Sequence, residues 1–65
     1  MYRVYHASLR CFADDPARVP RHAWVLQAEV PDATAARAIA LNITRQGVHS
    51  RITQAGRKAV LVPAA

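Results

Sequence analysis

Apolar and polar residues alternate most regularly between residues 22 and 30, H-A-W-V-L-Q-A-E-V. Successive side chains of a strand point to opposite faces, so this pattern predicts a half-buried strand. One face collects the larger apolar side chains: His22, Trp24, Leu26, Ala28 and Val30. We expect the side that carries Trp24 and Leu26 to face the core, because a slip of one residue would expose both.

The segment 2–12, Y-R-V-Y-H-A-S-L-R-C-F, also mixes aromatic and β-branched residues with polar ones, which predicts a second strand. The odd positions form the more apolar face: Tyr5, Ala7, Leu9 and Cys11. The even positions form a mixed face: Tyr2, Val4, His6, Ser8 and Arg10. We expect this mixed face to be half-buried, as on an antiparallel sheet with one solvated side, with a binding platform as the alternative.

The stretch from Asp32 to Gly47, D-A-T-A-A-R-A-I-A-L-N-I-T-R-Q-G, predicts a helix. Asp32 is a suitable N-cap, because its carboxylate accepts from free backbone N–H groups and meets the positive end of the helix dipole. Gly47 supplies the left-handed residue that ends the helix. The periodicity of the helix predicts these residues for its core face: Ala35, Ala36, Ile39, Ile43 and Gln46, with Ala40 at the edge.

Leu41 lies in the middle of the opposite, polar face of this helix, which also carries Thr34 and Thr44. It is one turn from Arg37 and one turn from Arg45. An isolated exposed leucine is common in soluble proteins and needs no function. The alternative is a small apolar anchor between two guanidinium groups, a composition typical of protein interfaces.

Two further segments connect or complete these elements. Residues 13–21, A-D-D-P-A-R-V-P-R, contain two prolines and little periodicity, which predicts a loop that carries Arg18 and Arg21. Residues 48–54 and 58–63 are short strand-like runs, and Gly56 between them favours a hairpin turn. Pro63 then ends the last strand or places it at an edge.

The order strand, strand, helix, strand, strand predicts an α+β fold. We expect an antiparallel or mixed sheet of about four strands with the helix packed on one face. The 65 residues form a single small domain, 1–65, which buries only about 60% of the surface of its unfolded chain. The other face of the sheet is open to solvent or to a partner, and a second copy of the chain is a candidate partner that would give a homodimer.

Charge is the strongest compositional signal, since eight arginines and one lysine oppose four acids and give a net charge of +5. A basic chain attracts nucleic acid, acidic protein surfaces and anionic membranes. No apolar run approaches the ~20 residues of a membrane span, and the first residues show no signal-peptide pattern. We therefore expect a cytoplasmic protein without a membrane partner.

The sequence contains no recognisable catalytic or metal-binding motif. Cys11 is the single cysteine, so neither an intramolecular disulfide nor a thiol pair for zinc is available. The spacing of His6, His22 and His49 matches no local metal-ligand motif. The serines have no acid–base neighbours at recognisable spacing, and neither phosphate-binding glycine motif occurs. We expect a protein that is not an enzyme and binds no metal or cofactor.

The portion from Ala23 to Val62 is a strand that leads into D-A-T-A-A-R-A-I-A, a helix that ends at Gly47, and a closing hairpin. It resembles small phage-encoded accessory proteins, including some anti-CRISPR proteins. The resemblance implies a compact, non-enzymatic inhibitor that masks a nucleic-acid channel or a subunit surface of a nuclease complex. The same segment is similar to half of a SPOR-type peptidoglycan-binding domain.

Two hypotheses of function follow. The first is a non-enzymatic binding protein that occupies a surface of a larger complex, plausible partners being an acidic protein surface or a ribonucleoprotein. Its predicted site comprises Arg37, Leu41 and Arg45 on the helix with Arg18 and Arg21 from the loop. The alternative is a small nucleic-acid-binding regulator. It would contact phosphates through a continuous face made by Arg18, Arg21, Arg51, Arg57 and Lys58.

Overall fold

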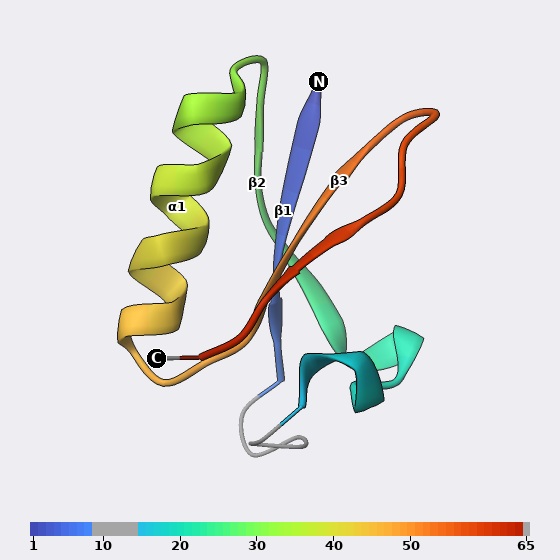
Figure 1. The fold of residues 1–65 in the computed structure, drawn as a ribbon, viewed down its shortest axis with the longest axis vertical. Coiled ribbons are helices and arrows are strands. Elements are labelled where there is room, and N and C mark those ends of the chain that lie inside the picture. Colours follow the sequence, from blue (N-terminus) through green and yellow to red (C-terminus); the bar gives the residue numbers. More distant parts are fainter. Residues whose placement is uncertain (9–14, 65) are drawn as a thin grey trace.

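The structure is a computed structural model that describes residues 1–8 and 15–64. It confirms the α+β class: four strands and one α-helix occur in the described residues, with two short 3-10 helices after the first strand (Figure 1). The main elements are β1 (Tyr2–Ala7), β2 (Trp24–Val30), α1 (Ala33–Arg45), β3 (Ser50–Gln54) and β4 (Val60–Val62). The 3-10 helices span Pro16–Arg18 and Arg21–Ala23, within and just after the segment expected to be an irregular loop.

The strands form one sheet in the order β2-β1-β3-β4, and each neighbouring pair is antiparallel. Helix α1 lies along one face of this sheet (Figure 1). It connects β2 at one edge to β3 on the far side of β1. The expected position of the helix on one face is therefore confirmed, and within residues 1–8 and 15–64 no α-helix lies over the opposite face.

A β-bulge at Gln27 decides which side of the sheet each residue of β2 faces. Val4 pairs with Ala28, but the next residue of β1, Tyr5, pairs with Leu26, so that Gln27 has no partner. A bulge of this kind shifts the alternation by one residue. Ala28 therefore faces α1, while Leu26 lies on the opposite side and is 48% exposed. The expectation that the Trp24 and Leu26 side faces one common core with Ala28 and Val30 is wrong for this reason.

Two small apolar clusters stabilise the two sides of the sheet. The cluster under the helix contains Val4, Ala36, Ala40 and Ile43, and Val4 is fully buried. The cluster on the other side contains Ala7, Val19 and Ala23, with Trp24 packed against it.

The even, mixed face of β1, which was expected to be half-buried, is the face that α1 covers, and Val4 on it is fully buried. On the odd face, Val19 and Ala23 from the segment 15–23 are buried against Ala7. Two members of the expected apolar face, Leu9 and Cys11, are outside the described residues. The count of apolar residues along β1 therefore does not indicate which side carries the helix.

The predicted ends of the helix are confirmed. The Asp32 carboxylate accepts from the backbone N–H of Thr34 at 3.2 Å, and Gly47 has a φ of 80°. The core face is displaced from the predicted one, because Thr44 is buried and Gln46 is exposed. The Thr44 hydroxyl donates to the Leu41 carbonyl at 2.9 Å, and this local hydrogen bond lets a polar side chain enter the core.

The predicted hairpin is also confirmed. Ile52 of β3 pairs with Val60 of β4, and the N–H of Arg57 donates to the Gln54 carbonyl at 3.1 Å to close the turn. Strand β4 ends at Val62, directly before the proline. The backbone N–H of Ala64 then donates to His49 Nδ1 at 2.8 Å, which fastens the end of the chain beside β3.

Candidate functional site

The first candidate site is a groove between α1 and the β3–β4 hairpin, called here the α1–β4 groove. Its volume is about 780 Å³ and its lining is mainly apolar, comprising Tyr2, Ala33, Thr34, Arg37, Ala40, Leu41, Ile52, Val60 and Val62. Leu41 and Val60 are 46% and 57% exposed, so two large apolar side chains are presented to solvent here. The residue that the sequence singled out on the polar helix face thus contributes to a groove.

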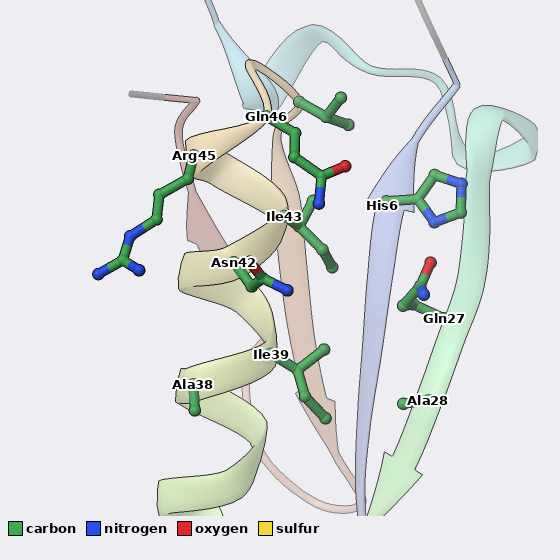
Figure 2. Close-up of a pocket in the computed structure, with 10 residues that line it drawn as sticks. His6, Gln27, Ala28, Ala38, Ile39, Asn42, Ile43, Arg45 and Gln46 are labelled. Carbon is green, nitrogen blue, oxygen red and sulfur yellow. The ribbon is translucent and has the colours of Figure 1, made fainter.

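The three helix residues predicted as one site, Arg37, Leu41 and Arg45, do not line the same groove. Arg37 and Leu41 both line the α1–β4 groove, and no acid is among the lining residues. Arg45 borders a different groove, between α1 and β2, and Figure 2 shows its guanidinium pointing away from that groove. The structure therefore brings Arg37 and Leu41 together but does not add Arg45 to the same hollow.

The two loop arginines lie elsewhere. Arg18 is exposed in the 3-10 helix Pro16–Arg18, where its Nε lies 3.8 Å from Asp15 Oδ2. Arg21 is exposed at the start of the second 3-10 helix. Val19, which follows the first 3-10 helix, and Ala23 of the second join the cluster of Ala7, and Figure 1 shows both short helices on the side of the sheet away from α1. Arg18 and Arg21 are therefore not part of the α1–β4 groove.

The side of the sheet away from α1 carries an aromatic and arginine group, called here the uncovered face, which comprises Tyr5, Trp24, Leu26, Arg51 and Leu61. The Arg51 guanidinium lies 5.8 Å from the centroid of the Tyr5 ring and 6.0 Å from that of Trp24. Such distances allow cation–π attraction. Beside this group, Arg3 and Glu29 form an exposed ion pair with an N–O distance of 3.5 Å.

The basic residues of the alternative set do not form one compact patch. Arg51 lies in the middle of the uncovered face, and Arg57 and Lys58 are exposed at the tip of the β3–β4 hairpin. Figure 1 shows this tip and the 3-10 helices at opposite ends of the molecule. The set is therefore divided into three groups, and the ion pair with Asp15 partly neutralises one of its members.

A second groove lies between α1 and strands β1 and β2, called here the α1–β2 groove (Figure 2). Its volume is about 810 Å³. Its lining includes His6 and Gln27 from the sheet and Ile39, Asn42, Ile43 and Gln46 from the helix. Figure 2 shows the two isoleucines pointing into the space between helix and sheet, with the amides of Asn42 and Gln46 on the helix side and His6 and Gln27 across from them.

His6 contributes an unusual atom to this groove. Among the described side chains, its Nδ1 is the one buried nitrogen or oxygen without a hydrogen-bond partner. The bulge supplies Gln27, since an extra residue in β2 turns its side chain toward the helix side together with that of Ala28. Sequence reasoning missed this groove. Asn42 and Gln46 are one turn apart and could have been found, but the bulge that adds Gln27 has no signal in the sequence.

Within residues 1–8 and 15–64, no three His, Cys, Asp or Glu side chains lie together as potential metal ligands. The helices of the described chain are too short or too polar to cross a membrane. Comparison of the chain with protein-family models, curated proteins and solved structures found no match.

Proposed function

We propose that this chain is a non-enzymatic binding protein that docks on an acidic segment of a larger protein complex through the α1–β4 groove. The observation that carries the proposal is the position of Leu41 beside Arg37 at an apolar hollow. Exposed leucine and valine side chains provide area that a partner can cover, and arginine forms bidentate hydrogen bonds with carboxylates. A partner segment with an apolar side chain next to an acid matches this arrangement.

The charge of the groove supports an acidic partner over a second copy of the chain. Arg37 lines the groove and no acid does, and Arg57 and Lys58 precede β4 in the sequence. Two copies that met through this surface would bring like charges together, which disfavours association. Inhibition of a host defence complex, as the resemblance to anti-CRISPR proteins implies, would use such a surface and stays a prediction.

The proposal is tested with two variants of matched exposure. Leu41→Asp places a charge in the groove, whereas Leu26→Asp places the same charge on the uncovered face, and the two leucines are 46% and 48% exposed. Binding is measured by NMR titration with short peptides that combine a central leucine with glutamates, and with lysine-containing counterparts as the charge control. We expect Leu41→Asp to weaken binding of the acidic peptides by about tenfold or more, the effect of a moderate interface hot spot.

The outcome is interpreted only if circular dichroism shows that both variants keep the wild-type fold. Equal losses in the two variants, or equal binding of acidic and basic peptides, would contradict the assignment of the groove. An absence of binding by any acidic peptide would contradict the proposed partner chemistry.

A second candidate function is nucleic-acid binding at the uncovered face, and the position of the Arg51 guanidinium near the Tyr5 and Trp24 rings favours it. Aromatic rings and arginine on an open sheet can stack with bases, while neighbouring cations contact phosphates. Titration with generic single- and double-stranded nucleic acid at low and near-physiological salt tests it. Phosphate contacts predict a log–log salt slope of several units.

Arg51→Ala should weaken this binding, and Arg37→Ala, on the other side of the molecule, should leave it nearly unchanged. If no nucleic acid binds at low salt, or if the two variants behave alike, the second candidate is wrong.

A further inference from the structure

We propose that the α1–β2 groove binds a small, flat, uncharged heterocycle whose edge carries both hydrogen-bond donors and acceptors, the chemistry of a nucleobase. This site is separate from the α1–β4 groove and from the uncovered face. The inference rests on the shape of the hollow, on the polar groups that meet in it, and on the buried nitrogen of His6.

The shape suits a small ligand. A volume of about 810 Å³ is in the range of sites that hold small organic molecules. Ile39 and Ile43 form an apolar wall on the helix side, and Figure 2 shows both directed toward the sheet. Ala28 on the sheet and Ala38 on the helix are small and leave room. A flat apolar ring can lie against the isoleucines with its edge toward the polar groups.

The polar groups match the edge of such a ring. Gln27, Asn42 and Gln46 each offer one carbonyl oxygen and one amide NH₂ group, so each can accept and donate. Carboxamides pair bidentately with adjacent donor and acceptor atoms, as asparagine and glutamine do with adenine. Because the carboxamides come from both walls, from Gln27 and from Asn42 with Gln46, they can contact a single ligand from two sides (Figure 2).

His6 supplies the observation that points to an occupant. Its Nδ1 is buried and has no partner, and leaving a buried polar atom unpaired costs free energy. Because solvent does not reach this nitrogen, a ligand in the groove would satisfy it once the His6 or Gln27 side chain changes rotamer. Native proteins rarely leave such atoms unpaired except where a water, ion or ligand provides the missing hydrogen bond.

The charge of the groove argues for an uncharged ligand. No acid is among the described lining residues, which disfavours a cation. The guanidinium of Arg45 points out of the groove in Figure 2, so it does not attract an anion into the hollow, but it can interact with a substituent that leaves the groove. A free nucleoside and a base of a single-stranded nucleic acid present the same edge, so the experiment must include both sources.

The test is an NMR titration of the full chain with adenosine, guanosine, cytidine and uridine, and with single-stranded oligonucleotides of mixed sequence. We expect saturable shifts of the amide signals of Ile39, Asn42 and Ile43 with at least one nucleoside or with the oligonucleotides. Binding by free nucleosides identifies a small-molecule site, and binding by oligonucleotides alone identifies a base pocket for a strand; both support the proposal.

Asn42→Leu and Gln27→Leu remove the polar groups and keep side-chain volume, and Gln54→Leu on β3 is the control outside the groove. Asn42 is exposed on the helix, so that its variant should fold even if Gln27→Leu does not. We expect at least tenfold weaker binding for Asn42→Leu and unchanged binding for Gln54→Leu. No saturable shift in the groove with any of these probes, or equal effects of Asn42→Leu and Gln54→Leu, would overturn the proposal.

Discussion

Val4 is the residue on which the core under the helix most depends. Its side chain is fully buried between β1 and α1, where it contacts the cluster of Ala36, Ala40 and Ile43. A domain of this size is only marginally stable, so one such side chain matters for the whole fold.

We predict that Val4→Ala lowers the free energy of unfolding by about 2 kcal/mol, the transfer cost of the lost methyl groups plus a cavity term. Urea unfolding followed by circular dichroism measures it. Val25→Ala is the control, because Val25 is 44% exposed and its truncation should cost less than about 0.5 kcal/mol. Similar losses in the two variants would mean that Val4 is not the centre of this core.

Ser50 is a buried polar residue between the helix and the sheet. The sequence shows no acid–base neighbours for the serines at recognisable spacing, and the side chain of Ser50 is fully buried at the start of β3. Its hydroxyl donates to the Ala40 carbonyl of α1 at 3.4 Å. This hydrogen bond links the helix to the sheet at a point where a larger residue would not fit the buried position. Ser50 therefore contributes to packing between the two layers.

At the scale of elements, α1 was predictable because its determinants are local. The N-cap, the apolar periodicity and the glycine that follows the last turn all lie within residues 32–47. The same holds for the hairpin, whose turn contains Gly56 with a φ of 77°. Elements whose ends are set by nearby residues can be read from the sequence alone.

Gly47 gives a test of this local control. Its φ of 80° is a conformation that alanine adopts at a cost, and a methyl group at its Cα would meet no atom within 4 Å. The effect of Gly47→Ala is therefore confined to the backbone, and we predict a loss of about 1 kcal/mol in the free energy of unfolding. Thermal and urea unfolding measure it.

Gly47→Asn serves as the comparison, because asparagine tolerates the left-handed conformation better than alanine does. It should cost less than Gly47→Ala. If alanine were tolerated as well as glycine, the positive φ would not be required to end the helix.

The sides of β1 and β2 that face the helix could not be predicted, because they depend on contacts between residues that are distant in the sequence. The bulge at Gln27 exists only in the pairing of β2 with β1, and no residue type in β2 predicts it from the sequence. The burial of Val19 likewise depends on Ala7 and Ala23, which are distant from one another in sequence. Regular alternation in a sequence therefore identifies a strand more reliably than it identifies the side that is buried.

For the molecule as a whole, the sequence identified half of the first candidate site. Leu41 and Arg37 follow from the helical periodicity, but the opposite wall comes from Val60 and Val62, which reach α1 only through the order of the strands. The α1–β2 groove was missed for the same reason, since it joins β1, β2 and α1. To predict a site between two elements, one must know the topology of the fold. To predict a site on one face of a helix, the helical periodicity of the sequence is enough.

The distribution of charge is also a property of the whole molecule. The arginines and the lysine of the described residues are divided among the helix surface, the uncovered face, the hairpin tip and the 3-10 helices. The two ion pairs among the described residues, Arg3–Glu29 and Arg18–Asp15, are exposed and contribute little to stability. The helix side and the uncovered face thus each have their own cations, which is why the two candidate functions can be separated by single arginine variants.

Trp24 is the single tryptophan of the chain, and the Arg51 guanidinium lies 6.0 Å from the centroid of its ring on the uncovered face. Its fluorescence is therefore a native optical reporter of one side of the molecule. An occupant of the uncovered face would displace Arg51 or contact the indole, and so alter the emission intensity or wavelength. An occupant of the α1–β4 groove, on the opposite side of the sheet, would leave the emission unchanged. Tryptophan fluorescence of the unlabelled protein can thus show which of its two sides a partner binds.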